Sequence, residues 1–403
     1  MNHKWFLLYM MIIIPIFLTG CSNQKELNDL AIISAMAIDK NDDGTYTKTI
    51  QIINPINVAG GLQGGGGGQS PTVSVYSANG HSALEAHFNA TSKVSRRLYH
   101  AHANLLVISE EIAKEGGIST ILDSFERDPE IRNTLKLVIA HDTKAGDLLK
   151  TLTAIDKIPA EQVNGTLKTT ELAKGENLEV SIQEFISALT TDGREPVLSG
   201  YRMKGKVKQG KDVTNVQKSE PDTTMEADGL AIFREGKLID WYQGETSRGV
   251  VWLLDKIKQT DVELDWKGNR NSLVCNIIRQ KTKVTANRNK ELPVVTVRVR
   301  AEGDIREVRT PVNLDDPSII LELEKELRKE IKTELVQTVK KTQLNKTDIF
   351  GFGEVVHRSD PKQWERMKDD WNETFFPKLT VKVEVEAYIR RSGLRKKSYL
   401  SDM

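Results

Sequence analysis

An apolar run near the start of the chain restricts where the rest of the protein can fold and work. It extends from Trp5 to Leu18, contains 14 residues without a charge, and is interrupted by Pro15. A helix that crosses a bilayer needs about 20 apolar residues, so this run is too short to span one. The run also lacks a polar face, which disfavours the alternative of a buried helix packed on a cytoplasmic domain.

The residues around this run have the order of a secretory signal peptide. Lys4 precedes the run, and Leu18-Thr19-Gly20-Cys21 follows it, which resembles a bacterial lipobox rather than a simple secretory cleavage site. We expect cleavage after Gly20, with S-diacylglyceryl and N-acyl groups on Cys21. Because two or more acyl chains anchor a protein stably, residues 1–20 are predicted to be a signal peptide and 21–29 a lipidated tether.

Charge and cysteine content exclude further classes of protein. After removal of residues 1–20 the chain has equal numbers of basic and acidic residues, so it lacks the basic excess of a nucleic-acid binder. Cys275 is the only other cysteine and lies in the apolar stretch "NSLVCNIIRQ". With Cys21 lipidated, Cys275 has no intramolecular disulfide partner, and we interpret it as a buried, inert thiol.

The first half of the body, residues 30–203, has the pattern of an α+β region. A hairpin is predicted around Asp43-Gly44. Seven glycines fall within 60–68, but a strand follows them where a dinucleotide-binding turn would need a helix, so they indicate a flexible loop. A helical subdomain is expected near 143–190, and the polar stretch 204–224 is either a linker or a long hairpin.

The second half, residues 225–400, is predicted to be an α+β domain. It combines a hairpin at Glu235-Gly236, alternating strands typical of an antiparallel sheet with one wet face, a long helix over 317–345, and a helix capped by Asp360 that continues to 376. A closing strand follows. Without repeated βαβ units, the expected fold class is α+β, with two to three domains of mixed or antiparallel sheets packed with helices.

The sequence contains few groups arranged for catalysis or metal binding. His100 and His102 could form a pair of metal ligands, but no third ligand cluster accompanies them, so no metal and no cofactor are predicted. The local signatures of serine and zinc hydrolases are missing. The 56 acidic residues cannot identify a glycosidase pair without geometry. We therefore expect a protein that is not an enzyme.

Three features together resemble a known family. They are the lipobox, the stretch "GLAIFREGKLIDWYQGETSRGVVWL", and the C-terminal block "DIFGFGEVVHRSDPKQWERMKDDWNETFFPKLTVKVEVEAYIRRSG". The chain resembles a spore germination lipoprotein of the Ger(x)C type, the C subunit of GerA-type nutrient germinant receptors. The resemblance covers essentially the whole chain and implies three α+β domains without established catalytic residues.

The resemblance also implies partners and a location. Such a subunit would be lipid-anchored on the outer face of the spore inner membrane, or cell membrane, of an endospore-forming bacterium. It would act with two integral membrane subunits, A and B, to trigger germination in response to nutrients. Residues Gly351, Phe352, Gly353 and Glu354 are candidates for contact with these partners, although tight structural turns are an alternative use of this stretch.

Two functions of other classes remain open at this point. One is an extracytoplasmic solute-binding lipoprotein that delivers a small molecule to a transporter. Such proteins are typically built from repeated βαβ units with a ligand cleft between two lobes, which the expected antiparallel strands disfavour. The other is an anchored hydrolase, for which the chain offers no motif.

Overall fold

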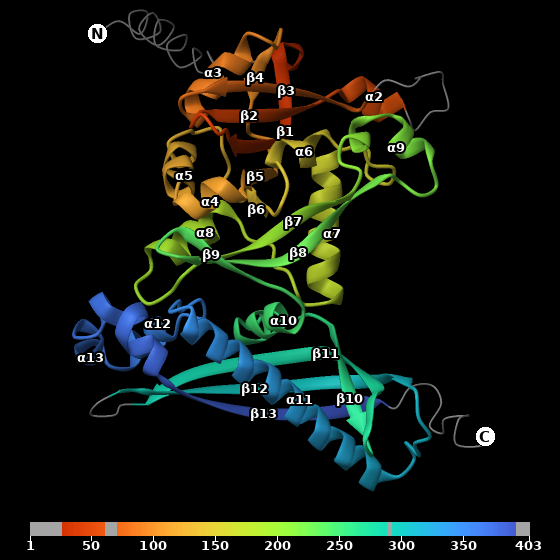
Figure 1. The fold of residues 1–403 in the computed structure, drawn as a ribbon, viewed down its shortest axis with the longest axis vertical. Helices are drawn as coiled ribbons and strands as arrows, with labels where there is room; N and C mark the ends of the chain where they lie inside the picture. The colour runs from red at the N-terminus through yellow and green to blue at the C-terminus, as the bar shows by residue number, and fades with distance from the viewer. Residues whose placement is uncertain (1–25, 61–70, 288–291, 392–403) are drawn as a thin grey trace, which may run out of the picture.

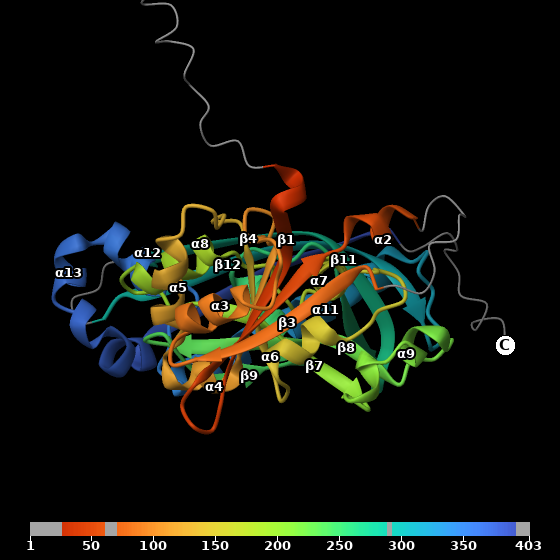
Figure 2. The same cartoon turned by 90° about the horizontal axis from the view of Figure 1, so that it is seen from above.

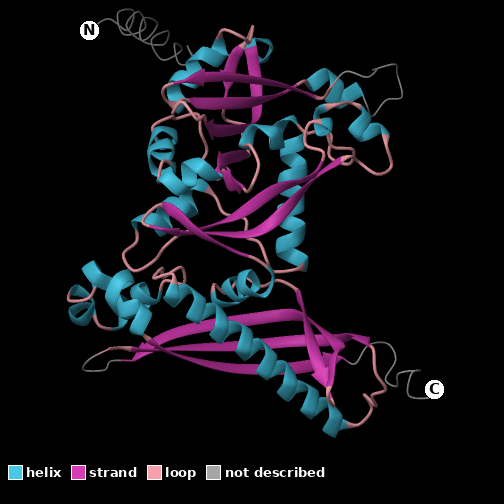
Figure 3. Ribbon diagram, viewed as in Figure 1, coloured by secondary structure: helices cyan, strands magenta, loops and turns pink. Residues whose placement is uncertain are grey.

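The structure, a computed structural model, describes residues 26–60, 71–287 and 292–391. These residues form two β-sheets with packed helices, arranged one above the other along the long axis of the molecule (Figure 1). Helices and strands both contribute to each part (Figure 3), which confirms the predicted multi-domain α+β fold. The predicted signal peptide, Cys21 and residues 61–68 of the glycine-rich stretch lie outside the described residues.

The first sheet contains nine strands and has a parallel centre. Its order is β3 (Val73–Gly80), β2 (Tyr46–Ile53), β1 (Leu30–Lys40), β5 (Leu105–Ser109), β6 (Lys136–Ala140), β7 (Val197–Gly205), β8 (Thr223–Arg234) and β9 (Lys237–Tyr242), with β4 (Arg97–Tyr99) beside the start of β1. Strands β1, β5, β6 and β7 run parallel, and the short β4 also pairs parallel with β1. The other strands, β2, β3, β8 and β9, pair antiparallel.

The parallel centre corrects the expectation that βαβ units are absent. Strands β5 and β6 each contain four consecutive apolar residues, which is consistent with a buried strand. Such a run does not reveal the direction of the neighbouring strands, so the parallel pairing was missed. The α+β class still holds because antiparallel strands flank this centre.

Helices cover both faces of the first sheet. One layer holds α3 (Ala83–Thr91), α4 (Glu110–Glu115), α5 (Ile118–Glu126) and α8 (Ile182–Thr190), and the other holds α6 (Ala145–Lys150) and α7 (Pro159–Ala173). Successive side chains of a strand point to opposite faces, and Leu106 and Val107 of β5 accordingly belong to different clusters. The predicted helical region 143–190 is thus divided between two layers and does not form a separate subdomain.

The polar stretch 204–224 connects β7 to β8, which are antiparallel neighbours. It contains η3 (Gln209–Lys211) and α9 (Thr214–Gln217), and the Asn215 amide donates to the carbonyls of Leu152 and Thr223. The stretch is therefore the connection of a long hairpin, the second of the two predicted alternatives. Strands β8 and β9 belong to the first sheet. The boundary between the two sheets therefore lies after β9, later in the chain than the predicted domain boundary at residue 225.

The second sheet has four strands and carries the long helix on one face. Its order is β10 (Thr260–Trp266), β11 (Asn269–Asn287), β12 (Val294–Val308) and β13 (Thr380–Arg391). The first three pair antiparallel as predicted, whereas β13 runs parallel to β12. The alternation of residues in β13 identifies a half-buried strand but not the direction of its neighbour, so the sequence could not reveal this pairing. Parallel neighbours require a crossover, and α11 (Pro317–Leu344) lies in it.

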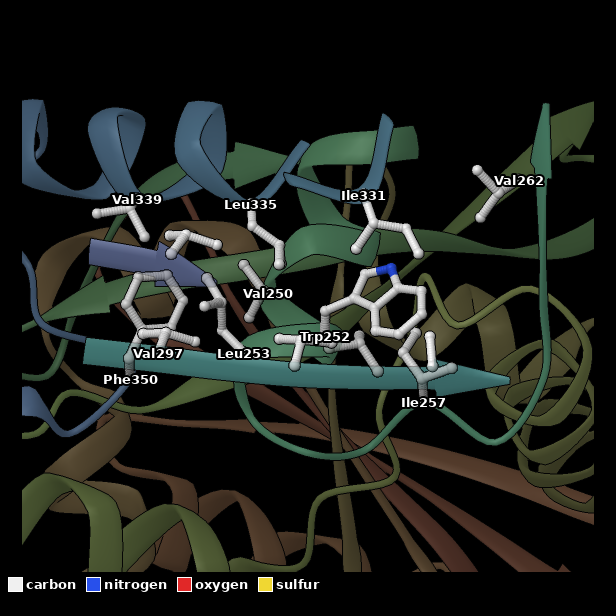
Figure 4. Packing of buried hydrophobic residues seen from close by; sticks show 14 of the residues in the cluster. Val250, Trp252, Leu253, Ile257, Val262, Val297, Ile331, Leu335, Val339 and Phe350 are labelled. Atoms are coloured by element: carbon white, nitrogen blue, oxygen red, sulfur yellow. The ribbon is translucent and has the colours of Figure 1, made fainter. Parts of the chain in front are cut away.

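The core of the second part forms where α11 and α10 (Gly244–Leu253) pack on this sheet. Figure 4 shows Ile331 and Leu335 of α11 directed toward Val250 and Trp252 of α10, with strand residues beneath them. The predicted stripe of α11 is buried throughout, at Leu323, Leu327, Ile331, Leu335 and Val339. Asp316 caps this helix, because its carboxylate accepts a hydrogen bond from the backbone N–H of Ser318.

The helix predicted from Asp360 to 376 is only partly correct. Asp360 caps α13 (Pro361–Glu365) by accepting from the backbone N–H of Gln363. The chain then changes to η4 (Lys368–Asp370), a π-helical turn η5 (Trp371–Phe375) and η6 (Phe376–Lys378). Trp364 and Trp371 pack edge to face with their ring centroids 5.1 Å apart. The α-helix thus ends in the same segment in which these two indole rings pack against each other.

Truncation of the α11 stripe tests this core. We expect Ile331→Ala to lower the free energy of unfolding by about 2–5 kcal/mol, because it leaves a cavity in a buried cluster. Leu321→Ala on the same helix is the control, since Leu321 is 63% exposed, and it should change stability by less than about 0.5 kcal/mol. Denaturant unfolding followed by circular dichroism measures both, and equal losses would contradict the assignment.

Candidate functional site

The two sheet-containing parts meet at a seam built by the residues that follow α11. We define the seam as Asn345–Asn372 of the second part together with the loop 191–196 and strands β8–β9 of the first. The Thr347 hydroxyl donates to the carbonyl of Phe233 at 2.6 Å, and the Asn345 amide donates to Asp240 at 2.8 Å. Hydrogen bonds between distant segments therefore tie the parts together.

Asp348 is the buried centre of this seam. Its carboxylate accepts the backbone N–H groups of Phe350 (3.2 Å), Phe352 (3.1 Å) and Gly353 (2.7 Å), as well as the indole N–H of Trp371 (2.9 Å). Burial raises the pKa of the Asp348 carboxyl to about 6, although these donors lower it. One side chain thus orients the first turn of α12 (Phe352–Ser359) and the indole of Trp371 together.

Glu195 faces Asp348 from the first part. The backbone N–H of Glu195 donates to the carbonyl of Asp348 at 2.8 Å. Its carboxylate accepts the backbone N–H of Glu235 at 3.0 Å and the amide of Asn372 at 2.8 Å. Burial raises the pKa of the Glu195 carboxyl to about 7, against the effect of these two donors. The seam therefore contains two acidic groups that hold their protons more strongly than exposed carboxyls do.

Two glycines allow the parts to approach closely beside these carboxyls. A Cβ atom on Gly353 would lie 2.6 Å from the Cα of Gly193 and 2.7 Å from the ring of Trp364. Gly193 also has φ +75°, a conformation that favours glycine. Any larger residue at either position would push the two backbones apart, so the contact depends on both glycines.

The four residues proposed for partner contact form part of the seam. Gly351 has φ +71° and begins α12, and Phe352 and Gly353 are buried. Glu354 retains partly exposed side-chain surface, and it pairs with Arg358 one turn later at 2.7 Å. Gly351 and Gly353 lie against Arg194 and Gly193 of the first part, as tight structural turns allow, whereas Phe352 packs against Phe350 and Phe376 of its own part. Of the four residues, only Glu354 is partly exposed.

A cavity of about 440 Å³ lies along the seam. Residues of the first part such as Phe185, Arg194 and Glu195 line it together with Leu254 and Ile349 of the second. Small-molecule sites often occupy clefts of this size between domains. Glu195 already accepts two hydrogen bonds from the protein, so its carboxylate has little remaining capacity to bind a ligand.

The structure separates the two histidines of the "YHAHA" stretch. Strand β4 ends before them, and the buried ring of His100 lies 4.8 Å from that of His87. His102 instead contacts the edge of Tyr99. Burial, and after it the charge of the nearby Lys48, lowers the pKa of His100 to about 4. His100 is therefore neutral at physiological pH and packs with His87 rather than with His102.

A polar cluster that was not predicted from the sequence lies at the carboxyl ends of β5 and β6. Glu110 directly follows β5, and His141 and Asp142 directly follow β6. Ligand atoms of these three residues lie within 4.8 Å of one another. Because the ends of parallel strands meet at one edge of a sheet, the position of each residue just after an apolar run was the available signal.

This carboxyl-edge cluster is already neutralised by the protein. His141 Nδ1 lies 2.6 Å from Asp228, which also pairs with Arg202 at 2.7 Å, and Lys114 pairs with Glu110 at 2.7 Å. The His141 ring stacks on Trp241 at 3.9 Å. These three residues have the types and spacing of metal ligands, but two cations already balance their charge. We therefore interpret the cluster as a structural network that joins β6, β8 and β9.

Cys275 is buried in β11, as predicted, and burial raises the pKa of its thiol to about 12. A thiol with such a pKa is protonated and unreactive at neutral pH. None of the helices in the described part of the chain is both long and apolar enough to cross a membrane.

Removal of the Asp348 charge tests the seam. We expect Asp348→Asn to destabilise the protein by about 2–4 kcal/mol, because an amide cannot accept all four hydrogen bonds and its own N–H₂ lacks acceptors there. The control Glu354→Gln lies in the same segment but on the surface, and it should cost less than about 0.5 kcal/mol. Urea unfolding monitored by tryptophan fluorescence compares the two, and a harmless Asp348→Asn would refute the central role of this carboxylate.

The raised pKa of Glu195 gives a pH dependence with a defined sign. The folded protein holds this proton more tightly than the unfolded chain does, so its contribution to stability is complete below pH 4.5, the ordinary pKa, and is lost as the pH rises through 7. Between pH 5 and 8 the loss should be about 2–3 kcal/mol. Stability of Glu195→Gln should fall less over this range, as calorimetry at several pH values would reveal; parallel curves would contradict the assignment.

Comparisons with known proteins agree with this architecture. Residues 23–203 match the family described as "Spore germination protein N-terminal domain", and residues 228–393 match "Spore germination B3/GerAC like, C-terminal". The chain is 44% identical to spore germination protein KC of Bacillus subtilis (strain 168), with 98% of this chain and 97% of that protein covered.

More distant relatives extend the likeness. Identity to spore germination protein GerQC of Bacillus cereus is 25%, with coverage of 97% of this chain and 99% of that one. The crystal structure of the GerBC protein has the same fold, with a TM-score of 0.55 and 18% identity over 88% of this chain and 96% of that chain. The chain belongs to the Ger(x)C family of spore germination proteins.

Proposed function

We propose that this chain is a lipid-anchored, non-enzymatic subunit of a nutrient germinant receptor, the C subunit. It acts with two integral membrane subunits of the A and B types to trigger spore germination. The observation that carries this proposal is the match to spore germination protein KC over 98% of the chain. Because that match includes both sheets and the seam between them, the family role is proposed for the whole architecture rather than for one domain.

The anchor completes this proposal. Leu18-Thr19-Gly20-Cys21 offers the small residues and the thiol that lipoprotein processing needs, and two acyl groups suffice for a stable membrane attachment. The mature protein would lie on the outer face of the spore inner membrane. There it could reach the extracytoplasmic surfaces of its membrane partners.

The seam supports a role as a scaffold. Two rigid parts joined by a buried hydrogen-bonded contact can present surfaces in a defined relative orientation. A partner that binds one orientation better than another shifts the population toward it by its difference in affinity. A subunit of this kind therefore biases the state of a membrane complex without chemistry of its own.

The alternative is a solute-binding lipoprotein of a transporter. Two observations favour it, namely the parallel centre of the first sheet and the cavity of about 440 Å³ at the seam. The receptor role has the stronger support, because the relatives over the full length are named as spore germination proteins.

Lipidation is tested at the cysteine itself. We expect Cys21→Ala to abolish incorporation of labelled palmitate and to release the protein from the membrane or destabilise it. Cys275→Ala is the matched control, since this buried thiol is not acylated. Labelling is followed by metabolic incorporation and fractionation. Normal labelling of Cys21→Ala would refute the lipobox.

The receptor role is tested by co-purification from spore membranes. A tagged chain should recover a stable complex with two multi-span membrane proteins. Recovery of a tightly bound small molecule without such proteins would favour the solute-binding alternative and refute the receptor role.

A further inference from the structure

The end of the molecule that carries β1–β3 exposes apolar side chains on a short helix. Leu84 and Phe88 of α3 are 54% and 62% exposed, whereas Ala83, Ala86 and Ala90 of the same helix are buried against the sheet. Residues four apart lie on one helix face, so Leu84 and Phe88 form an outward stripe. Among the described residues no other part of the protein packs against that stripe closely enough to bury it.

A groove lined by apolar and polar residues lies beyond the C-terminal end of this helix. Its volume is about 610 Å³, and it is lined by the start of β1, the end of β2, the first residues of α2 (Pro55–Gly60) and the segment 94–96 that follows α3. Leu30, Ile32 and Val94 contribute apolar surface to it, and Ile56 at its border is 86% exposed. Viewed from above, α2, α3, β1 and β3 are all turned toward the viewer on one end face (Figure 2).

The proposed anchor lies within a short reach of this end. The described chain begins at Glu26, directly before η2 (Leu27–Asp29), and Asn28 lines the groove. Four residues lie between Cys21 and Glu26, and an extended chain spans at most about 3.4 Å per residue, so the five steps from Cys21 to Glu26 cover no more than about 17 Å. A lipid on Cys21 therefore keeps the groove near the bilayer surface at all times.

The charges around this surface are balanced. Lys93, Arg96 and Arg97 are exposed near the groove, but so are Glu26, Asp29 and Glu85. Electrostatic attraction to anionic lipid is consequently not the driving force. Burial of apolar surface remains as the driving force. Because the tether raises the effective concentration of this surface at the membrane, even a weak interaction with lipid is formed most of the time.

We propose that this surface, defined by Leu84, Phe88, Ile56 and the adjoining groove and called here the α3 face, inserts shallowly into the bilayer interface. The proposal rests on the lipid anchor of the proposed function. An acyl chain of Cys21 seated in the groove is the less favourable occupant, because its CH₂ groups are already buried in the bilayer and gain no apolar burial by leaving it.

Contact through the α3 face sets the orientation of the whole subunit. The second sheet lies at the opposite end of the long axis (Figure 1), so it would point away from the membrane. The α3 face would then be unavailable to soluble partners, and the second part with its charged outer strands would be presented to them.

The experiment uses the full lipoprotein reconstituted in phosphatidylcholine–phosphatidylglycerol vesicles. Leu84→Cys, Phe88→Cys and the control Leu321→Cys are each labelled with the environment-sensitive fluorophore NBD. Leu321 matches Phe88 in exposure, at 63% against 62%, but lies on α11 of the second part. Labelling is selective because Cys275 is buried and Cys21 carries lipid.

Flotation of the vesicles reports the anchor, and quenching by a doxyl-labelled phospholipid reports the orientation. We expect blue-shifted emission and severalfold stronger quenching at positions 84 and 88 than at 321, also in vesicles of phosphatidylcholine alone. If the protein floats with the vesicles but aqueous iodide quenches all three labels equally, the proposed membrane contact of the α3 face is wrong. The lipid anchor would still be supported by that result.

Two other results would also overturn the proposal. Labels at 84 and 88 that become shielded only when membrane subunits are reconstituted together with the chain would assign this face to a protein partner. Protein that neither floats nor shows quenching would overturn the anchor as well as the α3 face.

Discussion

The buried carboxylate of Asp348 is the interaction on which the arrangement of the two parts depends. It collects three backbone N–H groups and one indole N–H within a region without solvent. A buried charge of this kind is tolerated only when its hydrogen-bonding capacity is satisfied. The backbone carbonyl of Asp348 also accepts a hydrogen bond from the backbone N–H of Glu195. Asp348 therefore fixes both the local geometry of the second part and its attachment to the first.

The first sheet gives this seam a rigid base. Its parallel centre is buried on both faces, with clusters of apolar side chains above and below, as parallel sheets generally require. The hairpin of β8 and β9 extends that sheet to the seam, where Phe233 and Asp240 accept hydrogen bonds from the second part. The same sheet supports α3 at its other edge, so the seam and the proposed membrane contact lie on one continuous framework.

Many local features of the fold were predictable from neighbouring residues. The hairpin at Glu235-Gly236 has φ of +52° and +76°, as the mirror-image turn between two strands demands. The α11 stripe and the Asp360 cap were correct for the same reason, since each depends on residues within one or two turns. The predictions were wrong where contacts between distant segments determine the structure. Examples are the parallel pairing of β13 with β12 and the end of the α-helix at Glu365.

The sequence by itself determined the α+β class, the turns, the helix stripe and the family, because these follow from short-range periodicity and from motifs. It also indicated "GFGEV" as a candidate contact segment, but it could not reveal that Gly353 is buried against Gly193 of the other part. Only the tertiary structure decided that β8 and β9 belong to the first sheet and that Glu110 meets His141. The physical reason is that alternation specifies which face of a strand is buried, whereas its neighbours and their direction are chosen by packing across the whole chain.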